Sequence, residues 1–177
     1  MMYYRRKLPH WQTEGVPLFI TWRLAGSIAR AAMPRRFSEW DAELDRAAAG
    51  PMWLKDKRLA QLVSEAIIYG SINRKWYDLF AWVVMSNHVH IVIQPKIQMA
   101  RITRWLKGST AREANRILSR TGEPFWHAES FDHRVRNLQN AIQYVEQNPV
   151  SAGIVKRAAD YLWSSAGWAG ESACPTA

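Results

Sequence analysis

The stretch Trp76–Gln94, with the sequence WYDLFAWVVMSNHVHIVIQ, decides the fold of this chain. Its two halves, 76–85 and 88–94, are rich in β-branched and aromatic residues, and only Ser86 and Asn87 separate them. This pattern predicts a hairpin of two antiparallel strands joined by a tight turn. Pro95 is expected to end the second strand.

His88 and His90 lie two positions apart in the second of these strands. Because side chains alternate along a strand, both imidazoles are expected on one face, with Val89, Ile91 and Ile93 on the other, toward a core. Two neighbouring imidazoles on a rigid strand supply half of a metal site. A purely structural role for the pair is the alternative.

The other segments complete an α+β pattern. Expected elements are a strand at 16–24, a helix at 36–49, a helix that Asp56 caps, a helix at 99–119 with a bend at Gly108, an extended segment at 125–135 and a helix at 137–147. Their order is close to the ferredoxin-like (RRM-like) layout, an antiparallel sheet with helices packed on one face. We expect a single domain over residues 1–170 and a flexible tail at 171–177.

Composition limits the function classes. Hydrophobic residues make up 48% of the chain and ten tryptophans are present, which excludes a disordered protein. The 24 Lys and Arg residues outnumber the 15 Asp and Glu residues, and the net charge is +9. Such an excess favours a polyanionic partner, with nucleic acid as the first candidate.

The number of cysteines and the hydropathy of the sequence indicate in which cellular compartment the protein is expected. Cys174 is the only cysteine, so no disulfide can form within the chain, as is typical of a reducing compartment. The basic N-terminus is not followed by the apolar core of a signal peptide, and no apolar run approaches the length of a membrane span. We therefore expect a soluble cytoplasmic protein without a membrane partner.

A tyrosine and an amide share one face of the predicted helix at 137–147. Tyr144 flanks the apolar stripe of this helix, and Asn148 falls on the same face one turn later. Pro149 disfavours helical geometry at Asn148, which places this amide at the helix end. If the helix packs near the histidine strand, the Asn148 oxygen can supply a third metal ligand, and Gln147 is the rival ligand.

This combination of groups suits a particular chemistry. Two imidazoles, one neutral oxygen and open positions fit a divalent ion that acts as a Lewis acid. Closed structural zinc sites prefer four protein ligands, usually including cysteine. A tyrosine hydroxyl beside an open ion favours phosphoryl transfer through a covalent phosphotyrosine, which also allows strands to be rejoined. A small zinc hydrolase that uses water, and a non-catalytic RRM-like nucleic-acid-binding protein, are the alternatives.

These motifs resemble those of the REP-associated tyrosine transposases, relatives of the single-tyrosine HUH (IS200-like) transposases of bacterial insertion sequences. The resemblance is carried by MSNHVHIVI at 85–93 and by Tyr144 with NPVSAGIV at 148–155. Further similar segments follow in the expected order: FITWRL at 19–24, FDHRVR at 131–136 and YLWSS at 161–165.

The resemblance implies a ferredoxin-like domain with a metal centre for DNA transfer. It implies that Tyr144 attacks single-stranded DNA, forms a 5′-phosphotyrosine and leaves a free 3′-hydroxyl. His88, His90 and Asn148 would bind Mg²⁺ or Mn²⁺. The implied partner is hairpin or palindromic repeat DNA in a bacterial cytoplasm, and the protein would act as a monomer or a homodimer.

Basic side chains gather in the N-terminal arm and in the predicted helix at 99–119, for which a solvated helix face is the alternative reading. Candidate DNA contacts are Arg5, Arg6, Lys7, Arg23, Arg101, Arg104, Lys107 and Arg112.

Overall fold

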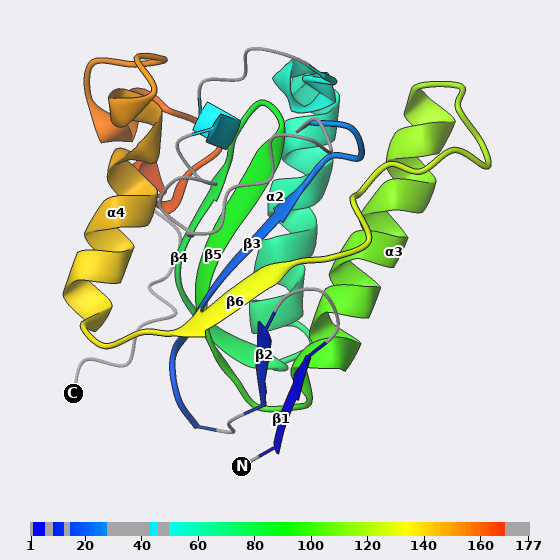
Figure 1. The fold of residues 1–177 in the computed structure, drawn as a ribbon. Coiled ribbons are helices and arrows are strands. Elements are labelled where there is room, and N and C mark those ends of the chain that lie inside the picture. The colour runs from blue at the N-terminus through cyan, green and yellow to red at the C-terminus, as the bar shows by residue number, and fades with distance from the viewer. Residues whose placement is uncertain (1, 6–8, 13–14, 28–42, 46–49, 169–177) are drawn as a thin grey trace.

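The computed structural model describes residues 2–5, 9–12, 15–27, 43–45 and 50–168 (Figure 1). Of the predicted helix at 36–49, only 43–45 are described, and they are helical. The predicted tail at 171–177 and the candidate DNA contacts Arg6 and Lys7 lie outside the described residues. Within the described part of the chain, no helix is both long enough and apolar enough to cross a membrane.

A four-stranded sheet forms the centre of the molecule (Figure 1). Its strands are β3 (Leu18–Arg23), β4 (Tyr77–Val84), β5 (His88–Pro95) and β6 (Phe131–Arg134). Their order is β4-β5-β3-β6, and every neighbouring pair is antiparallel. The connection β3-α2-β4 is split by β5, which is the ferredoxin-like arrangement that the sequence predicts.

Three helices and several short elements surround this sheet. The helices are α2 (Lys57–Ile72), α3 (Met99–Ile117) and α4 (Leu138–Ser151). Strands β1 (Met2–Arg5) and β2 (Pro9–Gln12) form a separate two-stranded sheet. The short 3₁₀ helices are η2 (Trp53–Lys55), η3 (Ala158–Asp160) and η4 (Ser165–Gly167).

Local sequence explains where α2 and α3 form. The Asp56 side chain accepts a hydrogen bond from the Arg58 amide and caps α2, as predicted. Helix α3 continues through Gly108 without interruption, because the helical backbone there tolerates a glycine at a modest cost. Strand β6 occupies only part of the predicted extended segment at 125–135.

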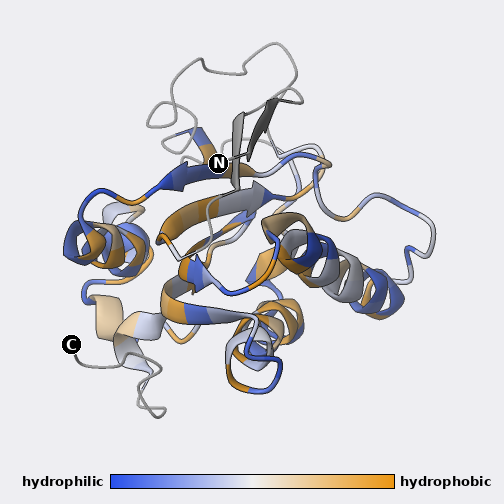
Figure 2. Ribbon diagram, turned by 90° about the horizontal axis from the view of Figure 1, so that it is seen from below, coloured by the Kyte–Doolittle hydropathy of each residue, from blue (hydrophilic) through white to orange (hydrophobic). Residues whose placement is uncertain are grey.

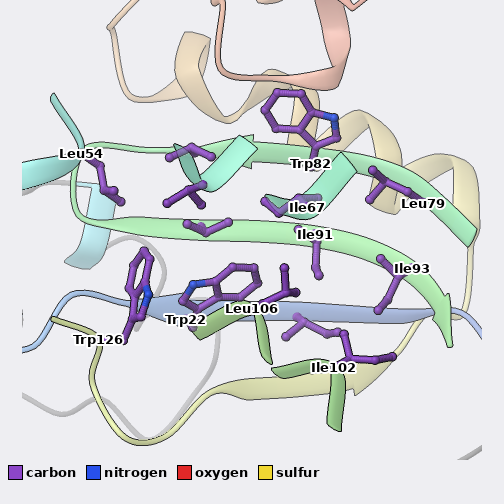
Figure 3. Packing of buried hydrophobic residues seen from close by; sticks show 14 of the residues in the cluster. Trp22, Leu54, Ile67, Leu79, Trp82, Ile91, Ile93, Ile102, Leu106 and Trp126 are labelled. Atoms are coloured by element: carbon purple, nitrogen blue, oxygen red, sulfur yellow. The ribbon is translucent and has the colours of Figure 1, made fainter. Parts of the chain in front are cut away.

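Both faces of the sheet are buried, whereas the sequence predicts helices on one face only. Helices α2 and α3 cover the face that carries Trp22 and Ile91 (Figure 3). Helix α4 covers the opposite face, where Val145 packs against Phe19 and Val92. In Figure 2 the central strands carry hydrophobic colours between helices whose outward sides are hydrophilic. The second covered face is the one that carries the two histidines.

Helix α4 is longer than predicted. It runs through Pro149 to Ser151, so the predicted end near Gln147 is wrong. Proline removes one backbone donor, and the last turn is closed by other bonds: the Ala152 amide donates to the Asn148 carbonyl, and the Ile154 amide donates to the Pro149 carbonyl, each over 2.9 Å. Asn148 therefore lies inside a regular turn.

Candidate active site

The two histidines of β5 meet on the face of the sheet that α4 covers. Both side chains are fully buried, and the Nε2 atoms of His88 and His90 lie 2.9 Å apart. Their ring centroids are 4.5 Å apart with an interplanar angle of 72°. The alternation predicted from the sequence is therefore present, and the two ring nitrogens converge on one point.

A buried amide fixes the tautomer of His88. The Nδ2 group of Asn87 donates to the Leu44 carbonyl over 3.0 Å, so its Oδ1 atom faces the Nδ1 atom of His88 at 2.6 Å. Because Oδ1 is only an acceptor, Nδ1 of His88 carries the proton. The Nε2 atom of His88 then presents a lone pair, as a metal ligand must.

A hydroxyl group holds His90 in a similar way. The Oγ1 atom of Thr21, on the neighbouring strand β3, lies 2.7 Å from Nδ1 of His90. A hydroxyl both donates and accepts, so this contact suits either tautomer of His90. With Nδ1 protonated, the Nε2 atom of His90 also presents a lone pair, and Thr21 accepts the hydrogen bond.

The environment keeps His88 neutral. Burial, followed by electrostatic interaction with the neighbouring His90, lowers the pKa of His88 well below its ordinary value. A neutral imidazole is the form that binds a metal ion, so His88 need not lose a proton to do so at neutral pH.

Asn148 reaches the same place from α4. Its side chain is 3% exposed, and its Nδ2 atom lies 3.5 Å from Oδ2 of Asp45. The other oxygen of Asp45 lies 3.5 Å from Nε2 of His88, so one carboxylate adjoins both residues. The Oδ1 atom of Asn148 is buried and has no hydrogen-bond partner among the described residues. Gln147, the rival ligand, is exposed on another side of α4.

Tyr144 lies one turn before Asn148 at the edge of the same site. Its ring centroid is 6.2 Å from that of His90 and 5.8 Å from that of Phe19. The side chain is 43% exposed. The ring thus contacts the histidine site on one side and remains accessible to a large substrate on the other.

The residues present fit a divalent ion. Two Nε2 atoms converge, their outer nitrogens are hydrogen-bonded, and a buried amide oxygen nearby lacks a partner. Among the described residues, no group of three or more His, Cys, Asp or Glu side chains has metal-binding spacing. The third ligand predicted from the sequence is the neutral oxygen of Asn148, and two imidazoles with such an oxygen suit an ion with open positions.

The family model for IS200-like transposases matches residues 53–148, more than half of the chain, and this range includes both histidines, Tyr144 and Asn148. The chain belongs to the IS200-like transposase family. The family is one of enzymes that cleave and transfer DNA. No curated protein matches the chain.

The fold of this IS200-like transposase is similar to that of a REP-associated tyrosine transposase solved with a bound REP hairpin. The two chains are 21% identical, the alignment covers 97% of this chain and 93% of the other, and the TM-score is 0.60. At this level of identity the similarity concerns the fold.

The predicted DNA contacts differ in their surroundings. Arg101, Arg104 and Arg112 are exposed on α3, on the opposite side of the sheet from the histidines. Lys107 donates from Nζ to the Ala128 carbonyl over 2.8 Å, and burial lowers its pKa to about 8. The side chain of Arg5, in β1, is outside the described side chains.

Arg23, another predicted DNA contact, is a buried residue. It is 2% exposed, it donates to the Ser27 hydroxyl over 3.3 Å, and burial lowers its pKa. It is the last residue of β3 and lies opposite His88 in the register with β5, so its side chain is on the same face of the sheet as the histidines.

Several site residues of this transposase have no recognisable signal in the sequence. Thr21 and Asp45 are 69 and 43 positions away from the histidines that they adjoin. Asn87 looks like an ordinary turn residue, yet it is 1% exposed and orients His88. Only the register between β3 and β5 would have indicated Thr21, which lies opposite His90.

Proposed function

We propose that this transposase is a metal-dependent endonuclease and strand transferase for single-stranded DNA, with Tyr144 as its nucleophile. The observation that carries the proposal is the position of α4, which places Tyr144 beside His90 and Asn148 near His88. A phenol ring thereby lies beside a group of side chains whose nitrogen and oxygen atoms suit a divalent ion.

The proposed reaction transfers one phosphodiester bond to the protein. The phenolic oxygen of Tyr144 forms a bond to phosphorus, and the bond between phosphorus and the 3′-oxygen breaks. The phenol loses its proton and the leaving oxygen gains one, so the products are a 5′-phosphotyrosine and a 3′-hydroxyl. Mg²⁺ or Mn²⁺ bound by His88, His90 and Asn148 would act as a Lewis acid toward the phosphate. Attack by a 3′-hydroxyl on the phosphotyrosine reverses the reaction and joins strands.

We infer that the substrate is a DNA hairpin or palindromic repeat with a single-stranded extension. The net charge of +9 favours a polyanion, and the exposed Arg101, Arg104 and Arg112 are the proposed phosphate contacts on α3. The transposase of similar fold was solved with a REP hairpin, which supports the same class of DNA here.

The covered faces of the sheet argue against a non-catalytic RRM-like nucleic-acid-binding protein. Such proteins stack bases on aromatic side chains of an open sheet. Here both faces are covered, and Phe19, an aromatic residue on the histidine face, is 2% exposed beneath α4. Binding by that mode would need α4 to leave the sheet.

The decisive experiment looks for a covalent protein–DNA adduct that survives SDS. Wild-type protein is incubated with a labelled single-stranded hairpin oligonucleotide and Mn²⁺, with and without EDTA. We expect an adduct that EDTA abolishes, that Tyr144→Phe cannot form, and that His88→Ala no longer forms in response to the metal. Tyr69→Phe is a matched control, because Tyr69 is 49% exposed and lies on α2.

The outcomes separate the candidate functions. An adduct that persists in Tyr144→Phe contradicts the assignment of the nucleophile. Metal-dependent cleavage without any adduct indicates a hydrolase that uses water. Binding that is indifferent to EDTA, without cleavage, indicates a non-catalytic nucleic-acid-binding protein.

A further inference from the structure

A cavity of about 520 Å³ opens beside His88. No residue role in the proposed reaction accounts for this cavity. Apolar side chains, among them Met52, Leu54, Met85 and Ile154, form about half of its walls, and Asp45 is a charged residue in the wall next to His88. The volume lies within the range of roughly 300–1,000 Å³ that is typical of small-molecule sites. The cavity is thus large enough for a nucleoside.

The order of residues along α4 locates this cavity relative to the nucleophile. Tyr144, Asn148 and Ala152 follow one another at intervals of one turn, and Ala152 lines the cavity. At a rise of about 1.5 Å per residue, the nucleophile and the cavity are roughly 12 Å apart along the helix, with the Asn148 amide between them.

Strand β5 independently shows the same sequence of features: the nucleophile, then the proposed ligands, then the cavity. His90 is the histidine whose ring adjoins Tyr144, whereas His88 lines the cavity together with Ser86. The convergent Nε2 atoms of the two histidines lie between these two ends. Two elements from different layers therefore place Tyr144 and the cavity on opposite sides of the proposed metal ligands.

This arrangement matters because an in-line displacement places the attacking and leaving oxygens on opposite sides of phosphorus. With Tyr144 on one side, the 3′-oxygen leaves toward the cavity. We propose that the cavity binds the nucleoside whose 3′-oxygen is displaced, that is, the nucleotide on the 5′ side of the cleaved bond. This inference rests on the proposed function of Tyr144.

The side chains around the cavity suit such a ligand. Met52 and Met85 are adaptable apolar side chains that pack well against aromatic rings, and Trp163 adds an aromatic surface. Lys55 and Lys57 are exposed and also line the cavity. They are placed to contact the next phosphate in the 5′ direction, while the apolar walls contact the base.

The first test uses mononucleotides and does not depend on catalysis. The four deoxynucleoside 3′-monophosphates and the four 5′-monophosphates are titrated into wild-type protein with Mn²⁺, and binding is followed by tryptophan fluorescence and calorimetry. We expect a 3′-monophosphate to bind about tenfold more tightly than its 5′ isomer, because only its phosphate meets the histidine site when the base is in the cavity.

A matched pair of variants localises the binding. Ile154→Asp removes an apolar wall and adds a repelling carboxylate, and we expect it to weaken binding at least about tenfold. Ile72→Asp is the control for the added charge, because Ile72 on α2 and Ile154 are 48% and 47% exposed. Equal binding of the two isomers, or equal effects of the two variants, would overturn the inference.

The second test uses DNA. After the cleavage position is mapped, the base on its 5′ side is removed to leave an abasic site. We expect adduct formation by wild-type protein to slow about tenfold, and Ile154→Asp to be indifferent to the change. Normal adduct formation on the abasic DNA contradicts the cavity assignment alone. Binding of 3′-monophosphates without any adduct contradicts the proposed role of Tyr144 alone.

Discussion

Thr21 is a buried hydrogen-bond partner of His90. Its hydroxyl lies 2.7 Å from Nδ1 of His90, and both residues are fully buried. A hydroxyl can donate to an imidazole in the free protein and accept from it once the opposite nitrogen binds a metal. The same contact therefore serves both states of the site.

Replacing Thr21 by valine keeps the shape of this side chain and removes its hydrogen bond. We expect the affinity for Mn²⁺ to fall about 10- to 100-fold, as is usual when a partner of a metal ligand is lost. Isothermal titration calorimetry measures this change. Thr103→Val is the control, because the Thr103 hydroxyl donates to backbone carbonyls of α3 and lies in a helix away from the histidines. Equal affinities in all three proteins would show that Thr21 does not orient His90.

Lys107 is expected to make the stability of the protein depend on pH. Burial lowers its pKa from 10.5 to about 8, so between these values the unfolded chain binds more protons than the folded one. The free energy of unfolding of the wild type, relative to Lys107→Met, is therefore expected to rise as the pH increases from about 8 to 10.5. Urea denaturation across this range measures the difference, and a flat profile would contradict the low pKa.

At the scale of elements, helix caps and strand patterns in the sequence predict most of the helices and strands that the structure shows. Asp56 and the apolar spacing of α2 predict that helix, and the β-branched runs predict β3, β4 and β5. Pro149 led to the wrong helix end. The proline lacks a backbone N–H, but this loss costs little in the last turn of α4, because the amides of later residues donate to the carbonyls there. The burial of the second sheet face is equally hidden, since the strands alone do not reveal which helix returns to cover it.

Two glycines in helices allow a test of packing. A Cβ atom at Gly70 of α2 would lie 2.8 Å from Cζ of Tyr77, a fully buried ring whose hydroxyl donates to the Ile67 carbonyl. Gly70→Ala is therefore expected to lower the free energy of unfolding by about 1–3 kcal/mol. At Gly108 of α3 a Cβ atom would meet nothing within 4 Å, so Gly108→Ala is expected to stabilise by up to about 1 kcal/mol.

Equilibrium unfolding in urea compares the two glycine variants. Because both substitutions add the same methyl group to a helix, the difference in sign isolates the contact with Tyr77. Stabilisation by Gly70→Ala would show that α2 moves away from β4 at little cost.

At the scale of the whole molecule, the proposed DNA contacts and the histidine site lie in different layers. Arg101, Arg104 and Arg112 follow α3, while Tyr144 lies on α4 across the sheet. A DNA molecule that reaches both must pass around an edge of the sheet. A hairpin with a single-stranded extension has the length and flexibility for this path.

Salt dependence tests whether the arginines of α3 contact phosphates. Each lost contact is expected to reduce the slope of log affinity against log salt by about 0.7–0.9. Arg101→Gln and Arg104→Gln are compared with Arg116→Gln, because the Glu113 carboxylate on the same helix already pairs with Arg116. Fluorescence anisotropy with a hairpin oligonucleotide measures the slopes. Equal reductions in all three variants would indicate only a general effect of charge.

The candidate site could be predicted from the sequence in part. The alternation around His88 and the one-turn spacing of Tyr144 and Asn148 are local patterns, so they are visible before the fold is known. Asp45 comes close through the packing of distant segments, which no local pattern encodes. The cavity is hidden for the same reason, since it lies where η2, the end of β4 and the end of α4 meet.

The packing of α4 against its own sheet has a kinetic consequence. Tyr144 adjoins His90 of the same chain. If these two residues act together in the proposed reaction, the nucleophile and the proposed ligands come from one polypeptide. Cleavage by such a centre is first order in protein, and the rate per molecule does not change on dilution. A cell with too few copies for two of them to meet on one DNA would keep the full cutting activity of each.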